Sequence, residues 1–391
     1  MITRVEIDGF KSFLDFKLDV PPFLALVGPN ASGKSNLFDA IEFNQKALRS
    51  PETALLEARR GRPFELFHRV VKGAPVEEIA VRVGRLLRLP DGFVGVDTRA
   101  GTRLDDKGIP GEVGNRLQIL HVPEQATFPA PVQQRVWQGV HEAISPTAAD
   151  QAFSGVMSRI RAGIDSVREY VPEPRLMRGR GSLADVVALA PDGSNLAAVL
   201  GRMRSSDALD DLVVDLAALI PDVREIKTEV NERHQEWSFE LVVEGQGAVP
   251  STLLSDGTLR ILGLLAALHD PDHSGVLMVE EIENGLHPGR LAELLRRIQE
   301  RVTDLNDPES LERPLRQVII TSHSPVVVSE LYRTRPESLV FMDTAVRVDP
   351  EKERVSRVTV AKPVRDEGEP GTFVSPRQVR KYLGTVRQDE L

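Results

Sequence analysis

Hydrophobic and polar residues alternate near the start of the chain, as they do in strands with one exposed face. Residues 2–10 and 13–20 both follow this two-residue period. Residues 23–28, FLALVG, instead form a continuous apolar run that ends in glycine, which is typical of a buried strand leading into a tight loop. In residues 36–48 the apolar positions recur every three or four residues and predict a helix. The chain therefore opens with strands, a loop and a helix.

The middle of the chain changes from strand to helix periodicity. Residues 77–89 and 92–98 have the pattern of further strands. From about Gln133 to Leu219 the apolar spacing predicts helices, over residues 132–144, 152–171 and 207–220. A loop rich in proline, glycine and arginine separates the last two helices. Because no heptad repeat is sustained here, the region predicts a compact helical lobe and not a long coiled coil.

Strands and helices alternate again in the last part of the chain. Strand patterns cover residues 223–230, 236–244, 275–283, 338–344 and 354–362, while a strand, turn and helix share 317–331. Helical patterns cover residues 255–270, 289–305 and 374–384. For the last helix, Ser375 is the predicted N-cap, Pro376 the first helical residue, and Gly384 lies past the end. The alternation predicts an α/β fold.

Composition narrows the class of protein. The chain has 391 residues, of which 41% are hydrophobic and 27% charged, as in globular proteins. Because it has no cysteine, disulfides, thiolate catalysis and cysteine zinc sites are excluded. No apolar run approaches the ~20 residues that a membrane span needs, and the N-terminus lacks a signal-peptide pattern. We therefore expect a cytoplasmic protein without a membrane partner.

The net charge of −9 argues against a surface that is basic throughout. Nucleic acid binding, however, depends on local basic patches and not on the total charge. Arginine-rich segments at residues 58–62, 85–88 and 175–181 offer such patches. Each is equally typical of a solvated loop or strand edge, so DNA as a partner stays open at this point.

Residues 28–35, GPNASGKS, match the Gly-x4-Gly-Lys-Ser pattern of a phosphate-binding loop. The glycines of such a loop let backbone N–H groups approach a β-phosphate without a Cβ clash, and the following helix N-terminus favours an anion. Lys34 can bridge the β- and γ-phosphates, and the Ser35 hydroxyl can coordinate Mg²⁺. Because the motif lies between a buried strand and a helix, it predicts binding of a nucleoside triphosphate.

Two carboxylates follow an apolar run later in the chain. Glu280 and Glu281 stand at the C-terminal end of a predicted strand, where α/β folds place their ligands. Glu280 is then placed to hold Mg²⁺, and Glu281, on the other side of the pleat, to polarise the attacking water. The alternative is a solvated strand end, which the phosphate-binding loop makes the minor interpretation.

Two other segments carry polar residues suited to a triphosphate. His323 ends the strand VIIT, from which it can hydrogen-bond a γ-phosphate, although a lone histidine is often structural. Ser255 is a predicted helix N-cap, with Asp256 and Gly257 in the first helical turn. A serine at a helix N-terminus is either an anion site or an ordinary cap, and the spacing alone favours neither.

In this order the four segments resemble the ABC-type ATPase heads of the SMC/RecF/OLD group, which are often described as AAA family ATPases. GPNASGKSNLFDAI is similar to that group's Walker A motif, and LLSDGTLR to its signature motif, the counterpart of the transporter LSGGQ. VLMVEEIENGLHP looks like its Walker B motif and D-loop, TSHSP like its switch histidine, and VEIDGFKSF like its first strand and turn. The likeness covers roughly residues 1–48 and 223–345. It implies a P-loop NTPase fold with an ABC/SMC-head-like mixed sheet and an inserted helical lobe.

The resemblance also implies how the chain is divided. Four segments are expected: a first ATPase lobe with Walker A at residues 1–130, the inserted helical lobe at 131–222, a second ATPase lobe with the signature, Walker B and switch histidine at 223–345, and a C-terminal extension at 346–391.

ATP and Mg²⁺ are the cofactors that the resemblance implies, and it assigns them residues of this chain. Lys34, Glu281 and His323 have the catalytic roles. Ser35 and Glu280 hold the metal, with Gln125 as the candidate Q-loop glutamine. The expected nucleotide contacts are Lys11, Ser12, Gly28, Pro29, Asn30, Ala31, Ser32, Gly33, Lys34, Ser35, Asn36, Ser255, Asp256 and Gly257. Glu280 stands where the group usually has aspartate, and its longer side chain is expected to lower metal affinity or turnover.

In the group that the chain resembles, the signature motif of one subunit closes on the ATP held by another. This implies a homodimer with shared ATP sites, or a higher oligomer, that closes on binding ATP and opens on hydrolysis. The 45 or so residues after FMDT hold no acidic cluster of the Toprim nuclease type. Either the closure itself does mechanical work by clamping DNA, or a separate, nuclease-like effector detects it, in DNA transactions or anti-phage defence.

Two other functions stay open from the sequence. A nucleotide-binding subunit of a transporter is disfavoured by the divergent LSDGT, by the SMC-like GKSN and by the helical insertion. The other is a scaffold that binds ATP but turns it over slowly because of Glu280.

Overall fold

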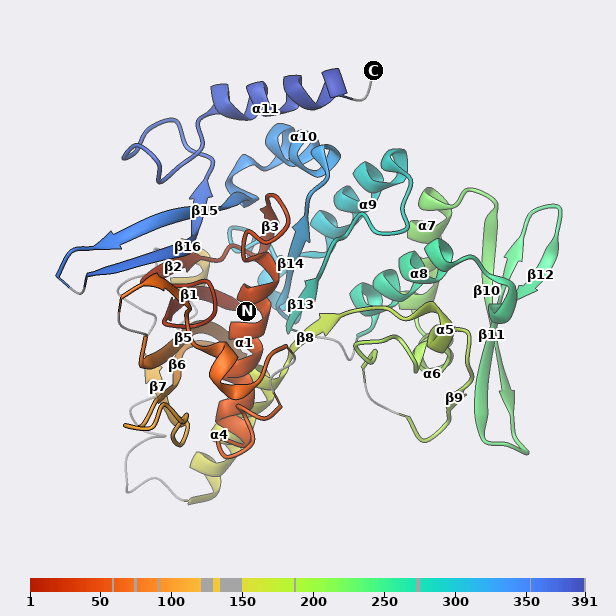
Figure 1. The fold of residues 1–391 in the computed structure, drawn as a ribbon. Coiled ribbons are helices and arrows are strands. Elements are labelled where there is room, and N and C mark those ends of the chain that lie inside the picture. The colour runs from red at the N-terminus through yellow and green to blue at the C-terminus, as the bar shows by residue number, and fades with distance from the viewer. Residues whose placement is uncertain are drawn as a thin grey trace. The chain divides into compact units, whose positions relative to one another are not determined.

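The computed structural model describes residues 1–57, 60–73, 76–90, 92–120, 129–133, 150–185, 188–271, 275–351 and 353–389 (Figure 1). They form two compact units, one made of Met1–Val167 with Thr303–Leu391, the other of Arg168–Val302. The predicted α/β class with a mixed sheet is confirmed. The boundaries of these two units differ from those of the four predicted segments. The division into four segments stays a prediction.

The first unit contains an antiparallel sheet in the order β2-β1-β5-β6-β7. Its strands are β1 (Ile2–Asp8), β2 (Phe16–Asp19), β5 (Glu78–Leu89), β6 (Gly92–Arg103) and β7 (Gly114–Leu120). β5 and β6 pair along their whole length. In β5, buried residues alternate with exposed or half-buried ones over residues 78–85. Helix α1 (Lys34–Arg49) lies against these two strands, so the helix that follows the phosphate-binding loop is fixed to the sheet.

A second sheet of the first unit carries the loop itself. In it, β3 (Phe23–Val27) runs parallel to β14 (Arg316–Ser322) on one side and to β15 (Leu339–Asp349) on the other. β16 (Arg354–Pro363) pairs antiparallel with β15, and β4 (Val70–Lys72) pairs with β16. All five residues of β3 are buried, as the apolar run predicted for a strand with neighbours on both sides.

The other helices of the first unit are α2 (Ala130–Gln133), α4 (Asp150–Asp165), α10 (Pro325–Thr334) and α11 (Pro376–Asp389). Its 3₁₀ turns are η1 (Pro63–Leu66), η3 (Ser310–Glu312) and η4 (Pro336–Ser338). α11 packs beside α10 (Figure 1). The predicted stop of this last helix at Gly384 is wrong. Gly384 has no positive φ and no neighbour within 4 Å of a built Cβ, so the helix continues through it.

The second unit combines helices with a small sheet. Its elements are β8 (Val167–Tyr170, which starts at the boundary), α5 (Pro174–Met177), β9 (Gly181–Ser182), α6 (Leu196–Met203), α7 (Asp207–Leu219), β10 (Val223–Asn231), β11 (Glu236–Val243), β12 (Gly247–Pro250), η2 (Ser251–Leu253), α8 (Asp256–His269), β13 (Gly275–Val279) and α9 (Pro288–Arg301). β10, β11 and β12 are antiparallel neighbours, and β9 pairs with β11. α7 packs against β10, α8 and α9.

The predicted helix over residues 152–171 is too long. It ends at Asp165, and residues 167–170 form β8 instead. The hydroxyl of Ser166 donates to the carbonyl of Gly163 at 2.7 Å and ends the helix. Val167 and Tyr170 are then buried from a strand, where β-branched and aromatic residues are favoured over the helix.

Candidate nucleotide-binding site

The loop between β3 and α1 has the shape of a phosphate cradle. Gly28 and Gly33 adopt φ values of 155° and 98°, which residues with a Cβ rarely adopt. A Cβ on Gly28 would lie 2.2 Å from the carbonyl oxygen of Met342, and one on Gly33 2.1 Å from Thr359 Oγ1. Both glycines are therefore required by close approach as well as by backbone conformation. Ala31 is also left-handed, with φ 62°.

Two side chains of the loop fit an anionic group. Ser32 is 1% exposed, and its hydroxyl has no hydrogen-bond partner among the described residues. A buried hydroxyl without a partner is costly, and a phosphate oxygen would supply the missing acceptor. Lys34 lies under the loop, where its ammonium donates to the carbonyls of Gly28 at 2.7 Å and Pro29 at 2.9 Å. Ser35, half-buried, follows it at the start of α1.

The turn after β1 is bonded to the same loop. Asn36 Nδ2 donates to Ser12 Oγ at 2.9 Å. The Thr359 hydroxyl lies 2.7 Å from Ser12 Oγ and 3.0 Å from the carbonyl oxygen of Ser32, and the backbone N–H of Thr359 donates to Ser12 O at 2.8 Å. The predicted residues Ser12, Ser32 and Asn36 thus form one cluster, and Thr359 of β16 joins them although the sequence analysis missed it.

Lys11 is fixed by an ion pair in the same turn. Its Nζ lies 2.6 Å from Asp39 Oδ2 on α1, and both side chains are largely buried. The carbonyl of Lys11, which can only accept, is 2.7 Å from His68 Nδ1, so this nitrogen of the imidazole carries the proton. Burial lowers the pKa of His68, and the nearby Arg354 lowers it further, so this imidazole stays neutral near pH 7.

His323 follows the last residue of β14 directly. Because Ser322 of β14 is level with Val27 of β3, His323 comes level with Gly28, the first loop residue. Its side chain is exposed. Ser324 caps α10 by accepting a hydrogen bond from the N–H of Val326 at 3.2 Å. The predicted strand–turn–helix is confirmed, and it carries the histidine to the edge of the sheet where the loop begins.

In the second unit, Glu280 and Glu281 follow β13 and are both half-buried. The strand ends at Val279, so the alternation of a pleat does not set the direction of Glu281 as predicted. Glu281 instead lies in a turn with φ 48°, and its Oε2 accepts a hydrogen bond from Asn284 Nδ2 at 2.7 Å. A recess of about 30 Å³ lies beside the two carboxylates, which is enough for one water molecule.

The start of α8 lies against the turn after β13, also within the second unit. Ser255 is the N-cap, as predicted, and its hydroxyl accepts from the N–H of Thr258 at 3.1 Å. A Cβ on Gly257 would lie 2.6 Å from the carbonyl oxygen of Gly285, so the two backbones touch. Asp256 pairs with Arg178 at 2.6 Å. Gln125, the candidate Q-loop glutamine, lies outside the described residues.

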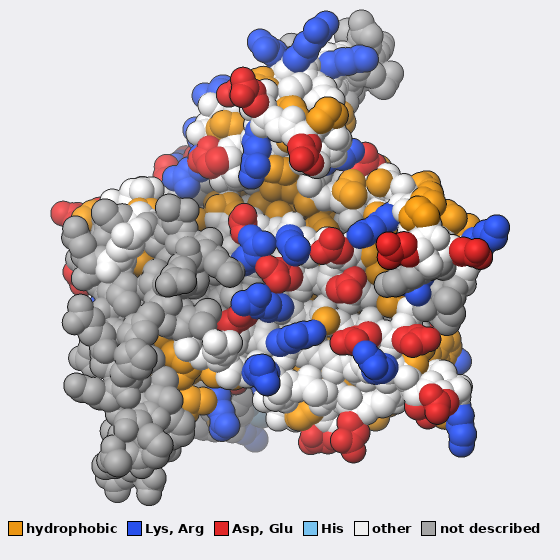
Figure 2. All heavy atoms as spheres, turned by 90° about the vertical axis from the view of Figure 1, so that its left-hand side faces the viewer, with side chains coloured by type: hydrophobic (Ala, Val, Ile, Leu, Met, Phe, Trp, Pro, Cys, Tyr) orange, Lys and Arg blue, Asp and Glu red, His pale blue; other side chains and the backbone are white. Residues whose placement is uncertain are grey.

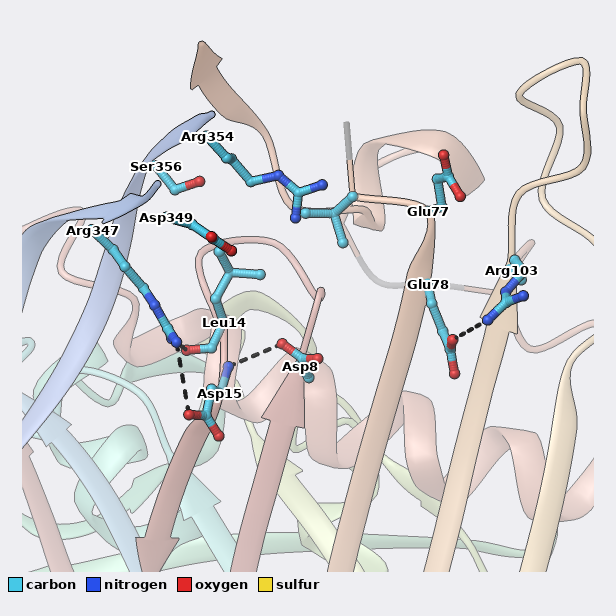
Figure 3. Close-up of a pocket in the computed structure, with 11 residues that line it drawn as sticks. Asp8, Leu14, Asp15, Glu77, Glu78, Arg103, Arg347, Asp349, Arg354 and Ser356 are labelled. Atoms are coloured by element: carbon cyan, nitrogen blue, oxygen red, sulfur yellow. Dashed lines mark hydrogen bonds and ion pairs between the residues drawn. The ribbon is translucent and has the colours of Figure 1, made fainter. Parts of the chain in front are cut away.

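A separate cleft of about 710 Å³ in the first unit has the wrong charge for a triphosphate (Figure 3). Its walls come from the turn after β1, from the start of β5 and from the β15–β16 hairpin. The charged residues that line it are Asp8, Asp15, Glu77, Glu78, Asp349, Arg103, Arg347 and Arg354. The carboxylates outnumber the guanidinium groups, and Arg103 pairs with Glu78 at 2.7 Å, so the cleft repels further negative charge.

Comparison with known proteins places the chain in a family. A family described as "AAA domain, putative AbiEii toxin, Type IV TA system" matches residues 23–81 and 157–329, more than half of the chain. The chain belongs to this family. The match includes the phosphate-binding loop, the signature motif, the carboxylates after β13 and His323.

Solved structures that resemble this chain include SMC heads. A crystal structure of the SMC head bound to the C-winged helix domain of ScpA has a TM-score of 0.55 and 14% identity, over 92% of this chain and 98% of that one. The SMC head domain of Pyrococcus furiosus, bound to the C-terminal domain of ScpA, has a TM-score of 0.51 and 14% identity, over 99% of both chains. The fold is that of an SMC/RecF-like ABC-type ATPase head.

A curated relative supports the same assignment over a short stretch. The chromosome partition protein Smc of Methanocaldococcus jannaschii is 54% identical over 43 residues, which are 11% of this chain and 4% of that protein. The chain thus matches only a small part of this relative's length. As a member of the AAA-domain family with an SMC-type head, the protein has a nucleotide-dependent function.

The structure changes the interpretation of the arginine-rich segments. Arg85 is 2% exposed and donates to Thr98 Oγ1 and Asn44 Oδ1 in the core. Burial lowers its pKa to about 10. Arg88 donates to two backbone carbonyls, and Arg180 pairs with Glu236 at 3.1 Å. Residues 58 and 59 lie outside the described part. Residues 85–88 are therefore not a phosphate-binding patch.

Charges of both signs are mixed on one face of the molecule (Figure 2). On the face seen in Figure 2, lysine and arginine side chains are mixed with aspartate and glutamate, unlike the single-sign surface of many nucleic acid-binding domains. No helix among the described residues is long and apolar enough to cross a membrane.

Proposed function

We propose that the protein binds ATP with Mg²⁺ and hydrolyses it, and that two copies close on the nucleotide. The observation that carries this proposal is the loop at residues 28–35, with its two glycines in close approach, the buried hydroxyl of Ser32 that lacks a partner, and Lys34 beneath. These features fit a triphosphate. The family assignment and the SMC-type fold support the same ligand.

Each proposed residue has a role that its chemistry supports. Lys34 and the loop N–H groups hold the β- and γ-phosphates, and Ser35 and Glu280 would hold Mg²⁺, which supplies charge for the phosphoryl transfer. Glu281, oriented by Asn284, accepts a proton from the attacking water. His323 donates to the γ-phosphate and distinguishes ATP from ADP. Ser255 and Gly257 of a second copy contact the same γ-phosphate and make the dimer depend on ATP.

The next part of the proposal concerns the biological task that ATP-dependent closure serves. The family's description refers to a putative toxin of a toxin–antitoxin system, and the similar SMC heads bind another protein, ScpA. Both support a head whose ATP-dependent closure is detected by a separate effector protein, in anti-phage defence or in a DNA transaction. Turnover that rises with DNA would favour the latter, and turnover that rises only with the effector the former.

The test combines ATP binding, turnover and assembly of the full chain. We expect the wild type to bind a fluorescent ATP analogue and release phosphate, and Lys34→Ala to lose binding. Glu281→Gln should bind ATP but turn it over about 100-fold or more slowly, because removal of a general base costs about 10²–10⁴-fold. With ATP it should sediment as a dimer. Glu283→Gln, in the same turn, is the matched control and should resemble the wild type.

Two outcomes would contradict the proposal. A wild type that binds no nucleotide would exclude the ATPase function altogether. A wild type that binds ATP without turnover, and without a dimer in the Glu281→Gln variant, would favour the slow scaffold instead.

A further inference from the structure

The signature helix begins with a charge that opposes its proposed ligand. Asp256 is the first residue of α8, directly after the N-cap Ser255. Its side chain is 69% exposed. Helix N-termini favour anions, but a carboxylate at the first position repels an approaching phosphate, since like charges in contact are unfavourable at any protein dielectric. The proposed contact with a γ-phosphate therefore needs something that offsets this charge.

Arg178 is bonded to this carboxylate. Its Nη2 lies 2.6 Å from Asp256 Oδ1 and 2.8 Å from the carbonyl oxygen of Leu254, so one nitrogen binds both the side chain and the backbone before the cap. The arginine side chain is 25% exposed, less than its partner. Arg178 thus cancels the charge of Asp256 and draws its carboxylate toward Leu254.

Arg178 is held in place by its backbone and by the residue before it. Its carbonyl accepts a hydrogen bond from Ser251 Oγ at 3.0 Å. The preceding residue, Met177, is fully buried, and a Cβ on Gly263 of α8 would lie 2.6 Å from its Cε. With its backbone anchored and its guanidinium bonded to Leu254 and Asp256, Arg178 is preorganised next to the start of α8, so it has little side-chain freedom to lose when a ligand binds.

The geometry points to Arg178 as a positioning residue of the signature helix. By neutralising Asp256 and holding its carboxylate aside, Arg178 lets Ser255 and the first N–H groups of α8 take up the γ-phosphate of ATP held by a second copy. This inference rests on the proposed function, because it concerns the same γ-phosphate contact. Without Arg178, Asp256 repels the triphosphate; without both residues, the repulsion is gone.

A double-mutant cycle tests whether Arg178 acts by neutralising the charge of Asp256. Arg178→Met, Asp256→Asn and the double variant are compared for phosphate release and, in the Glu281→Gln background, for ATP-driven dimerisation by sedimentation. We expect Arg178→Met to weaken dimerisation and turnover by about tenfold or more, an electrostatic loss of the size that one charge–charge contact at effective ε ≈ 20 allows. The double variant should recover to within a few-fold of Asp256→Asn. Binding of the fluorescent ATP analogue to the single chain should stay within about twofold of the wild type, because Lys34 and its loop are unchanged.

The salt dependence of the Arg178→Met defect distinguishes an electrostatic role of Arg178 from a purely structural one. If Asp256 repels the phosphate in Arg178→Met, the loss of turnover and dimerisation in this variant should become smaller when the salt is raised from about 0.05 to 0.5 M. The reason is that salt screens interactions between exposed charges. Arg180→Met is the matched control, since Arg180 is a close neighbour that pairs with Glu236 instead. It should behave as the wild type.

Three outcomes overturn the inference. If Arg178→Met turns ATP over as fast as the wild type, Arg178 does not act by neutralising Asp256. The same follows if the double variant is no better than Arg178→Met. Both outcomes leave ATP binding and dimerisation of the wild type intact. Equal thermal midpoints of the variants show that the comparison concerns folded protein. A wild type that neither binds ATP nor dimerises would overturn the proposed function itself, and this inference with it.

Discussion

Single residues far apart in the sequence hold the phosphate-binding loop in place. The hydroxyl of Thr359, near the end of the first unit, lies within hydrogen-bond distance of Ser12 Oγ and Ser32 O, while Thr359 itself is 2% exposed. Removing a buried hydroxyl takes one hydrogen bond from each partner, and a group that is left unsatisfied costs about 1–3 kcal/mol. The conformation of the loop therefore depends on a residue that belongs to no recognised motif.

Thr359→Val keeps the shape of this side chain but removes its hydroxyl. We expect the affinity for ATP to fall by about fivefold, which corresponds to about 1 kcal/mol, because Ser12 and the loop lose a shared partner. A titration with a fluorescent ATP analogue measures this. Thr359→Ser keeps the hydroxyl and should bind nearly as the wild type does. Equal affinities of the Val and Ser variants would show that the hydroxyl does not position the loop.

Contact between secondary-structure elements explains why two glycines of the second unit are needed. Gly257 at the start of α8 and Gly285 in the turn after β13 approach so closely that a Cβ on the first would lie 2.6 Å from the carbonyl oxygen of the second. Gly285 also has φ 77°, which disfavours any other residue. The turn that carries Glu281 is thereby packed on the helix that carries Ser255.

Gly257→Ala should separate these two elements. We expect phosphate release to fall about tenfold or more while the affinity of the loop for ATP changes by less than about twofold, because the substitution leaves Lys34 and the loop itself unchanged. Gly285 is not itself a proposed nucleotide contact, so an equal loss in Gly285→Ala would assign the effect to packing between the two elements. Normal turnover in both Gly257→Ala and Gly285→Ala would contradict this account.

Gly155 in α4 is a glycine without such a contact, because a Cβ built on it has no neighbour within 4 Å. Gly155→Ala should therefore stabilise the fold slightly, by about 0.5–1 kcal/mol.

Helices α7, α8 and α9 are joined by a buried carboxylate. Asp215 is 2% exposed, and its oxygens lie 2.8 Å from His269 Nε2, 3.2 Å from Arg297 Nη1 and 3.3 Å from Arg301 Nη2. Burial alone would raise the pKa of Asp215. The hydrogen bond from His269 and the charges of the two arginines outweigh it, and they hold the pKa below its usual value.

Asp215→Asn should destabilise the protein at neutral pH. A carboxyl whose pKa is lowered on folding contributes stability above its unfolded pKa of about 3.9, and that contribution is lost as the pH falls through the lower, folded value. Breaking a buried ion pair costs about 3–5 kcal/mol, so we expect a deficit of that order in urea unfolding at pH 7. The deficit should shrink at pH values below 4. A deficit that does not depend on pH would assign it to packing and not to charge.

The sequence predicted most elements of this fold but not the contacts among them. Periodicity was sufficient for β3, α1, α8 and α10, because each buries a continuous run or one face. It was wrong at residues 167–170, where a short strand follows the helix after a single residue, Ser166, and the apolar spacing continues across the change. The roles of Asp39, Thr359 and Arg178 were not predicted, because they arise from long-range contacts that no local pattern encodes. For Arg178 the sequence indicated only an arginine-rich segment at residues 175–181.

At the scale of the whole molecule, the motifs are divided between the two units. The loop and His323 belong to the first, and Ser255, Glu280 and Glu281 to the second. The proposed dimer adds a requirement of its own, because Lys34 and Glu281 of one copy act with Ser255 of the other. Such a site can be restored by mixing two variants that are each inactive, provided that their defects lie on opposite sides of the shared nucleotide.

Mixing Lys34→Ala with Ser255→Arg should therefore recover turnover. In a mixed dimer, one site combines both defects and the other has neither. Random pairing of equal amounts makes about half of the dimers mixed, each with one of two sites intact, so we expect about a quarter of the wild-type rate of phosphate release. Lys34→Ala mixed with Glu281→Gln is the matched control and should stay inactive, because both defects affect the nucleotide that their own copy holds. Recovery in the control mixture, or none in the first, would mean that ATP is not shared between copies in this way.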